Sequence, residues 1–473
     1  MLAIEIAQGI RLCLPSQLSH ISTHVFLEKE TWFEDEADFI ARVAEPAGRM
    51  LDIGSSFGFY ALSYAQAAGP GSRVWAFEPT PETCALLRES IRLNQFAHVT
   101  LLETAVGAES GRCRLMSEAS SELNRVDAER GTLDVAMAPL DVLAAEHGFD
   151  AVDFIKLDVE GHEAQVVRGG RAFFAQQSPL VMLEIKAASR VDYTATSMLE
   201  ELGYALYRLV PGLGVLTPFD KDQVDSYQLN LFACKADRAE RLAARGLLRV
   251  ATSGEEAIGS IEEVSAAIRA IPVLAPHATF FDAWLADAPA LDPYLLLLRR
   301  WVCANNSALS VAIRCAALEE AAKLARLVVS GPASLARCLT AARVLRAWGQ
   351  RGLAVSILGK ILPAVLQAAD LSIDAPLFPP LASYETWTTD MANWVKASVI
   401  ESAALWSTHA CYWGEPTQAS AAELLAYFGR QTPLFERRRQ LRGIMQGLQS
   451  GPRPHAMLAA KSAENRTPQS WCG

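Results

Sequence analysis

Residues 51–60 read LDIGSSFGFY, and this stretch decides the fold of the first half of the chain. The apolar run RMLDIG (Arg49 to Gly54) leads into the spacing Asp52-x-Gly54-x-x-x-Gly58, and a helical pattern follows. Glycines at such a turn let the chain bend sharply and let a ligand approach the backbone, while the next helix offers unpaired N–H groups. Taken alone, the pattern fits either a ligand-binding loop or an ordinary glycine-rich turn.

Outward from this stretch, short apolar runs alternate with helical patterns over residues 46–235. Strands that alternate with helices form βαβ units and predict a parallel sheet covered by helices on both faces. The further predicted strands are RVWAFE (Arg73 to Glu78), VTLLETAV (Val99 to Val106), VDFIKLD (Val152 to Asp158) and LVMLEI (Leu180 to Ile185). The predicted helices include Pro81 to Phe96 and His162 to Phe174. YALYRLV (Tyr204 to Val210) and QLNLFACK (Gln228 to Lys235) are expected to pair antiparallel at the sheet edge.

The second predicted strand ends in an acidic residue, Glu78. An acidic side chain at this place can accept hydrogen bonds from both ribose hydroxyls of a nucleoside cofactor. Dinucleotide-binding folds use the same device with a G-x-G-x-x-G loop, but Ser56 stands here where the second glycine would be. A nucleoside without a pyrophosphate therefore fits better.

The end of the fourth predicted strand, FIKLDVEGHE, gathers Asp158, Glu160, His162 and Glu163. Ligands of open α/β sheets bind outside the carboxyl ends of the strands, where the strand order reverses. Three acids and an imidazole within six residues are costly to bring together, because neighbouring acids raise one another's pKa. Their presence at this strand end therefore predicts a functional role for these polar side chains. Helix capping is the alternative, and we expect Glu163 to serve partly as a cap.

These motifs together resemble the FkbM-type O-methyltransferases. The resemblance covers residues 25–235 and rests on LDIGSSFGFY, VWAFEP, LRESIRLNQ, TAVG, PLDVL, FIKLDVEGHE and PLVMLEI in that order. It implies a class I, Rossmann-like, seven-stranded, mostly parallel sheet in the order 3-2-1-4-5-7-6, and S-adenosylmethionine as the cofactor. It also implies cofactor contacts at Asp52, Gly54, Ser55, Gly58 and Glu78, with the adenine near Thr104 and Ala105. The chain departs from the family's usual Ala-Asn at Ser55-Ser56.

The expected reaction is methylation of a hydroxyl oxygen. An alcohol that still carries its hydroxyl proton is a poor nucleophile, so we expect a base that takes this proton. Asp158 is the first candidate for this role, and His162 is the second, with a surface position on a helix as its alternative. Glu184, at the end of the fifth strand, is expected to join Asp158 in binding the substrate, or a divalent cation through its oxygens, although no residue pattern requires a metal.

The second half of the chain has a different texture, rich in alanine, leucine and arginine. We predict a lead-in segment (1–45), the methyltransferase domain (46–236), a connecting region of irregular chain or short helices (237–294), an all-α domain (295–448) and a frayed tail (449–473). The stretch from 333 to 362, with Gly349 and Gly352 at its turn, reads as a helix hairpin similar to one helical-repeat unit. The aromatic-rich region between Tyr384 and Trp413 is expected to pack in a core.

Composition limits the function classes further. Half of the residues (51%) are hydrophobic and the net charge is −10, so the chain is globular and a nucleic-acid backbone is not expected as a partner. Nine scattered cysteines without a C-x-x-C pair, and an N-terminus without a signal-peptide pattern, predict a cytoplasmic protein without a membrane span. His409, like the other isolated histidines, is expected to be structural or exposed.

Three functions remain open from the sequence. The first is O-methylation of a sugar, glycan or glycolipid. The second is O-methylation of a polyketide or other small metabolite. The third is a non-catalytic, methyltransferase-like scaffold whose helical half binds a protein partner or forms a homo-oligomer.

Overall fold

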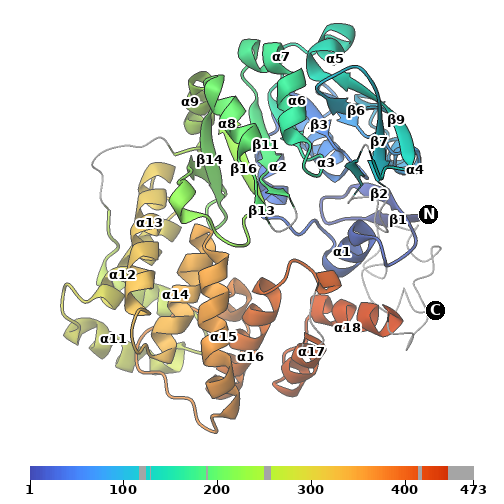
Figure 1. Ribbon diagram of the computed structural model, residues 1–473. Helices are drawn as coiled ribbons and strands as arrows, with labels where there is room; N and C mark the ends of the chain where they lie inside the picture. Colours follow the sequence, from blue (N-terminus) through green and yellow to red (C-terminus); the bar gives the residue numbers. More distant parts are fainter. Residues whose placement is uncertain (117–123, 128, 188–189, 250–256, 414–417, 446–473) are drawn as a thin grey trace.

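The computed structural model describes residues 1–116, 124–127, 129–187, 190–249, 257–413 and 418–445, so the predicted tail lies outside the described residues. Figure 1 shows two parts, a sheet half (residues 1–249) above a helical half (residues 257–445). Among the described helices, none combines the length and the apolar character that crossing a bilayer requires.

The sheet half contains one large sheet whose strand order confirms the expected one. The order 3-2-1-4-5-7-6 appears as β5-β4-β3-β10-β11-β16-β14, with β15 added as an eighth strand at the edge. The first five of these strands are parallel, and β16 is antiparallel to both β11 and β14. The bounds are β5 (Val99–Leu102), β4 (Arg73–Phe77), β3 (Arg49–Ile53), β10 (Phe154–Leu157), β11 (Leu180–Glu184), β16 (Asn230–Cys234), β14 (Ala205–Val210) and β15 (Val215–Pro218).

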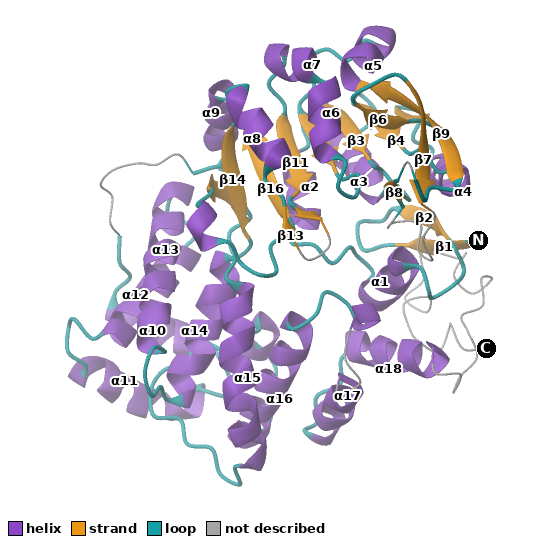
Figure 2. Ribbon diagram, viewed as in Figure 1, coloured by secondary structure: helices purple, strands orange, loops and turns teal. Residues whose placement is uncertain are grey.

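Helices cover both faces of this sheet, as Figure 2 shows. Alternate residues of a strand point to opposite faces, so Met50 and Phe154 join one core while Leu51 and Ile155 join the other. The first face is covered by α2 (Glu36–Val43), α3 (Phe59–Ala68), α4 (Pro81–Asn94) and α9 (Ala236–Ala244). The second face is covered by α5 (Leu140–His147), α6 (Glu163–Gly169), α7 (Arg171–Gln176) and α8 (Thr194–Glu201).

Three local predictions need correction. Residues 99–106 do not form one strand: the chain leaves the main sheet after β5, and β6 (Ala105–Gly107) begins a second sheet of order β6-β9-β7-β8. The helix predicted from 162 to 174 is broken between α6 and α7, because Gly170 is not helical (φ −114°, ψ 20°). The predicted antiparallel pairing of residues 204–210 with residues 228–235 is confirmed by β14 and β16, but this pair is not at the sheet edge, because the chain turns back after β14 into β15, which takes that place. The other strands of the second sheet are β7 (Gly111–Met116), β8 (Arg125–Val126) and β9 (Leu133–Pro139).

The lead-in segment folds onto the sheet half. A hairpin of β1 (Leu2–Glu5) and β2 (Arg11–Leu14) lies against α4, where the Cys13 N–H donates to Ser90 Oγ at 2.8 Å. α1 (Ile21–Lys29) follows, and the last helix of the chain, α18 (Pro433–Met445), packs against it (Figure 1). The two ends of the described chain therefore lie side by side.

The helical half is a sequence of helices in which each packs against the next. Capping side chains define several starts, such as Asp292, which accepts from two backbone N–H groups, and Gly349 ends one helix with φ +93°. α14 and α15 form the predicted hairpin. The helices are α10 (Ile261–Arg269), α11 (Ala278–Asp287), α12 (Pro293–Asn305), α13 (Val311–Val328), α14 (Leu335–Trp348), α15 (Arg351–Gln367), α16 (Met391–Trp406), α17 (Gln418–Tyr427) and α18.

Polar contacts hold the two halves together near the sheet edge. The Gly212 N–H donates to Ala347 O at 2.8 Å, Arg208 donates to Trp348 O at 2.7 Å, and Arg346 donates to Asp35 at 2.7 Å. The contacts between the halves place the end of α16 close to the lead-in segment.

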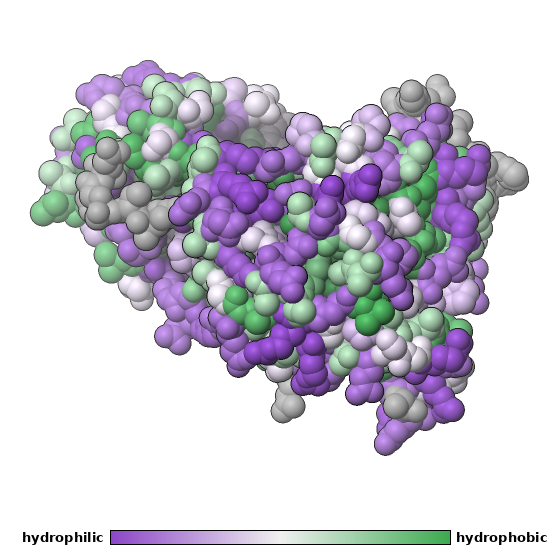
Figure 3. Space-filling view, turned by 90° about the horizontal axis from the view of Figure 1, so that it is seen from above, coloured by the Kyte–Doolittle hydropathy of each residue, from purple (hydrophilic) through white to green (hydrophobic). Residues whose placement is uncertain are grey.

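Seen from above in Figure 3, the hydrophobic areas on this face of the molecule are small and separated by hydrophilic side chains.

Candidate active site

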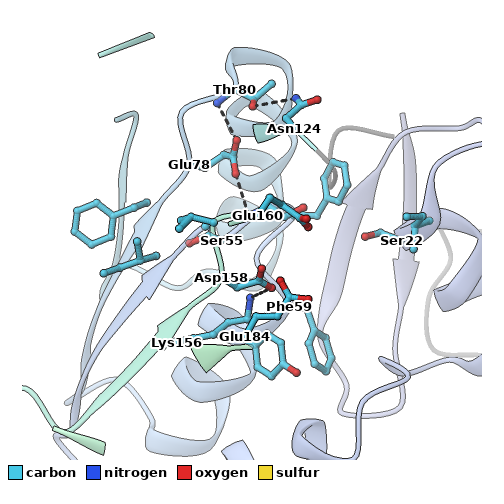
Figure 4. A pocket seen from close by; sticks show the side chains of 18 of the residues that line it. Ser22, Ser55, Phe59, Glu78, Thr80, Asn124, Lys156, Asp158, Glu160 and Glu184 are labelled. Carbon is cyan, nitrogen blue, oxygen red and sulfur yellow. Dashed lines mark hydrogen bonds and ion pairs between the residues drawn. The ribbon is translucent and has the colours of Figure 1, made fainter. Parts of the chain in front are cut away.

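The carboxyl ends of β3, β4 and β10 open into a cavity of about 430 Å³. Its wall is built by four parts of the chain: the lead-in segment, these strand ends, the second sheet and the chain that follows α16. Figure 4 shows Glu78 and Thr80 at one end of the group, and Lys156, Asp158 and Glu184 together at the other. Most of the site residues predicted from the sequence line this one cavity.

Gly54 and Gly58 are needed for close packing. Both have a left-handed backbone, with φ of +84° and +87°. A Cβ on Gly54 would lie 1.7 Å from the backbone oxygen of Asp158, so only a glycine lets the ends of β3 and β10 come together. A Cβ on Gly58 would lie 2.3 Å from Leu87 Cδ1. Gly54 lines the cavity, while Gly58 lies behind it at the start of α3.

Asp52 also lies behind the cavity wall. Its side chain is buried, and Oδ2 accepts the N–H of Ala61 at 2.9 Å, which fixes the first turn of α3. Burial raises the pKa of this carboxyl to about 6, although nearby Lys156 opposes the shift. The structure therefore places Asp52 as a support for the loop of residues 54–58.

Glu78 is held rigidly at the cavity wall. Its Oε2 accepts the N–H of Ser56 at 3.0 Å, and its Oε1 accepts the N–H of Thr80 at 2.8 Å. Each carboxylate oxygen keeps a second lone pair for a further donor. Burial raises the pKa of Glu78 to about 7, against the lowering effect of the Thr80 and Ser56 hydrogen bonds.

Ser55, Thr104 and Ala105 line the same cavity. The Ser55 hydroxyl donates to Asp52 O at 2.6 Å, so it helps to shape the loop. Thr104 donates to Ala136 O at 3.2 Å, which ties the second sheet to the cavity. The three residues thus lie where the main sheet, the loop and the second sheet meet.

Asp158 forms an ion pair inside the cavity. Lys156 Nζ donates to Asp158 Oδ2 at 2.7 Å and lies 5.0 Å from the centre of the Tyr60 ring. Glu160 and Glu184 complete a cluster with Asp158 in which one oxygen from each residue lies within 4.8 Å of the others. Such a set of oxygens has the chemistry to hold a divalent cation or to accept hydrogen bonds from hydroxyl groups.

The acids of this cluster differ in charge state. Burial, and then the nearby Asp158 charge, raise the pKa of Glu184 far above its ordinary value and that of Glu160 to about 8. Both side chains therefore carry protons at neutral pH and can donate hydrogen bonds. Asp158 is the member of the cluster that has a cationic partner, which favours it over Glu184 as the acceptor of a proton.

His162 also lines the cavity, at the residue that precedes α6. Burial lowers its pKa, so the imidazole is neutral at neutral pH. Its Nε2 is buried and has no hydrogen-bond partner in the described part of the chain. This environment keeps His162 a second candidate for the base.

Glu163, expected to be a cap, accepts the N–H groups of Val159 and Gly161 at 2.9 and 3.2 Å.

The part of the cavity wall that the lead-in segment and the helical half provide was not predicted from the sequence. Glu34 of the lead-in segment accepts a hydrogen bond from the Tyr60 hydroxyl and one from Asn230 at 3.1 Å. From the helical half, His409 and Trp413 reach the cavity. His409 was expected to lack companions, but its ring lies 4.9 Å from that of Phe33 and its Nδ1 lies 3.2 Å from Arg351 Nη1. No local pattern marks these residues.

Backbone strain gathers at the same place. Ser56 and Glu160 are not glycines, yet they have φ values of +47° and +54°, and both line the cavity. Residues held in this region cost free energy and cluster at ligand-binding and active sites. The Ser56 hydroxyl is buried and has no hydrogen-bond partner among the described residues.

Comparison with known proteins agrees with this geometry. Residues 52–209 match the model of the Methyltransferase FkbM domain. The chain is 26% identical over 186 residues to the 2-O-methyltransferase NoeI of Sinorhizobium fredii (strain NBRC 101917 / NGR234). The aligned residues make up 35% of this chain and 69% of that protein.

Solved structures with some likeness include Methyltransferase FkbM from Methylobacillus flagellatus KT, at 19% identity and a TM-score of 0.29. That likeness covers 40% of this chain and 44% of the other, so the chain spans less than half of that protein. A SAM-dependent O-methyltransferase from Thermotoga maritima is 17% identical, with a TM-score of 0.25, over 42% of this chain and 64% of the other.

The matched residues contain the loop at Gly54, the acid at Glu78 and the end of β10 at Asp158, which all line or shape one cavity. FkbM methyltransferases use S-adenosylmethionine as the methyl donor. With residues 52–209, the chain carries a methyltransferase domain of the FkbM family.

Proposed function

We propose that this protein is an S-adenosylmethionine-dependent O-methyltransferase whose acceptor is a hydroxyl of a sugar, glycan or glycolipid. The observation that carries the proposal is Glu78, fixed by two backbone N–H groups at the wall of the cavity that also holds Asp158. One side chain is thus prepared for a ribose and another for an acceptor hydroxyl.

The residues at the loop end of the cavity fit the cofactor. The free lone pairs of Glu78 suit two ribose hydroxyls. Gly54, Ser55, Thr104 and Ala105 line the adjoining wall, and the adenine would lie near Thr104 and Ala105. When bound, S-adenosylmethionine supplies an electrophilic methyl group on a sulfonium.

The other end of the cavity suits the acceptor. Asp158 would hold the acceptor hydroxyl and take its proton on a carboxylate oxygen, while Lys156 holds Asp158 in place. The protonated Glu160 and Glu184 would donate hydrogen bonds to neighbouring hydroxyls of the same acceptor. His162 stays the second candidate for the proton acceptor. Correct placement of the hydroxyl supplies a large part of the rate increase.

A hydroxyl acceptor agrees with the name of the NoeI relative, a 2-O-methyltransferase. A carbohydrate in particular is supported by the cavity wall. It combines aromatic rings, such as Trp32 and Phe33, with carboxyl groups, and this mixture suits a ring with hydroxyl groups and C–H faces.

The experiment that tests this proposal has two steps. Purified full-length protein is titrated calorimetrically with S-adenosylhomocysteine, and then incubated with methyl-labelled S-adenosylmethionine and a panel of glycans and small polyketides. Label in a glycan methyl ether is the expected result, and label in a polyketide alone would move the acceptor to the second class. A folded protein that binds no cofactor would instead favour the scaffold hypothesis.

A further inference from the structure

The chain that follows α16 forms part of the cavity wall, although it belongs to the helical half. We refer to residues 407–413 as the closing segment. His409 and Trp413 of this segment line the cavity, and they follow the last strand-end acid, Glu184, by 225 and 229 residues. Trp413 is 45% exposed, and its aromatic neighbours Phe33 and His409 are only half-buried, so these rings are not sealed inside a core.

Arg351 of α15 fixes the closing segment on the side of the helical half. Its guanidinium donates to Trp406 O at 2.7 Å and to Thr408 O at 2.8 Å. The same side chain contacts His409 Nδ1 at 3.2 Å and stacks over the ring of Tyr227 at 4.5 Å. One planar cation thus sets the path of the segment, because its donors have a fixed geometry.

Glu28 of α1 fixes the closing segment on the side of the lead-in segment. Its Oε2 accepts the N–H of Cys411 at 2.7 Å, and its Oε1 accepts from Arg438 of α18 at 2.6 Å. His24 Nε2 lies 2.9 Å from Cys411 Sγ. These side chains are buried, so the segment is anchored through an interior polar network on this side too.

Between these two anchors, the closing segment presents aromatic rings. His409 lies 4.9 Å from Phe33, and Trp413 meets Phe33 edge-on at 5.3 Å. The described lining of the cavity contains five carboxyl groups, and its one lysine or arginine is Lys156, which is already paired with Asp158. An anionic acceptor would therefore find carboxyl groups but no unpaired lysine or arginine in the described lining.

We propose that the closing segment selects the acceptor, with Phe33, His409 and Trp413 stacking on the C–H face of a hydroxyl-bearing ring that has no anionic group. This inference rests on the proposed function, and it assigns the helical half a direct part in substrate recognition. Glu28 and Arg351 are positioning residues, since they act through the segment.

The test uses full-length protein saturated with S-adenosylhomocysteine and saturation-transfer NMR. The probes are the neutral methyl glycosides of glucose, galactose and mannose, each compared with the methyl glycosides of glucuronic and galacturonic acid. We expect binding of at least one neutral glycoside and at least about fivefold weaker binding of the uronates. Trp413→Ala should raise the Kd of the neutral glycoside about 3- to 10-fold, the range for a lost aromatic contact.

Controls separate this inference from the proposed function. Trp413→Phe should keep most of the glycoside affinity, and Tyr427→Ala, an 82% exposed aromatic residue of the helical half, should keep all of it. Affinity for S-adenosylhomocysteine should be unchanged in every variant, which also shows that each one is folded. Equal glycoside binding by wild type and Trp413→Ala, equal binding of uronates, or no binding of neutral glycosides to the wild type would overturn the inference. Loss of S-adenosylhomocysteine binding by the wild type would instead count against the proposed function.

Discussion

The two halves of the molecule contribute to the same cavity in different ways. In the sheet half, the functional side chains follow directly after strands, so that Glu78 and Asp158 are placed by the sheet itself. In the helical half, His409 and Trp413 reach the cavity because buried polar contacts fasten the closing segment to α15 and to α1. The part of the site that the sheet half provides can therefore be predicted from local sequence patterns. The part that the helical half provides depends on contacts between residues that are distant in sequence.

The largest expected effect separates chemistry from binding in the sheet half. Asp158→Asn keeps the shape of the side chain but removes the proton acceptor, so turnover should fall about 10²- to 10⁴-fold. Steady-state methyl transfer to the acceptor that the wild type uses measures this change, and S-adenosylhomocysteine affinity should stay within about twofold. Asp150→Asn, at a 77% exposed side chain, is the matched control. Activity of Asp158→Asn within threefold of wild type would remove Asp158 from the role of base.

The next effect tests how firmly the halves are joined. Arg438→Met leaves the buried Glu28 carboxylate without its cationic partner, which should lower the free energy of unfolding by about 3–5 kcal/mol. Arg439→Met breaks an exposed pair with Glu436 on the same helix and should cost less than about 1 kcal/mol. Denaturant unfolding of both variants gives the comparison. Similar losses for the two would show that the buried network does not join the halves.

The same pair predicts how stability depends on pH. Burial by itself would raise the pKa of Glu28, but Arg438 and the Cys411 hydrogen bonds outweigh it and hold the pKa below its ordinary value of 4.5. A depressed folded-state pKa stabilises the protein above the unfolded pKa, and this contribution is lost as the pH falls through the folded value. Glu28→Gln should therefore flatten the acid limb of the stability curve below about pH 4.5. A limb unchanged by this substitution would contradict the assignment.

A pair of glycine substitutions tests the packing that brings two strand ends together. Gly54→Ala introduces a Cβ 1.7 Å from Asp158 O and an unfavourable backbone conformation, so we expect a loss of about 2–5 kcal/mol. Gly148→Ala has a φ of +67° and a ψ of 52° with open space around the added carbon, and should cost about 1–2 kcal/mol. Thermal unfolding measures both, and equal losses would mean that the contact at Asp158 carries no weight.

The smallest expected effect is a pH dependence of cofactor binding. Ribose hydroxyls donate hydrogen bonds to the ionised Glu78, whose pKa burial raises to about 7. Below that pH the carboxyl carries a proton that must be lost on binding, so the Kd for S-adenosylhomocysteine should rise by up to about tenfold per pH unit from pH 7 to 6. The dependence should disappear in Glu78→Gln, and a flat profile in the wild type would contradict it.

The central sheet was predictable from sequence because its signals are local. Continuous apolar runs bounded by glycine and acidic residues marked β3, β4, β10 and β11 correctly, and their carboxyl ends fixed the position of the site. The second sheet was not predictable in this way. Residues 99–106 have the pattern of one strand, and the departure of β6 depends on its pairing with β9, more than twenty residues later.

The part of the cavity wall that the lead-in segment and the helical half provide had no local signal. Glu34 lies in a lead-in segment without a motif, and it reaches the cavity through the contacts with Tyr60 and Asn230. His409 seemed isolated in sequence because its neighbours in space, Phe33 and Arg351, lie far away along the chain. The aromatic-rich region was correctly expected to pack in a core at Tyr384 and Trp394, which are buried, but not at Trp413.

We propose that the cavity of the sheet half binds S-adenosylmethionine through Glu78. The most direct test is calorimetric titration of wild type, Glu78→Ala and Glu103→Ala with S-adenosylhomocysteine, where Glu103 is an exposed acid close to the same sheet edge. We expect a Kd on the order of micromolar for the wild type and for Glu103→Ala. The affinity of Glu78→Ala should fall about 10- to 100-fold, because two hydrogen bonds to a charged group are removed. Equal binding by wild type and Glu78→Ala would mean that Glu78 does not hold the cofactor.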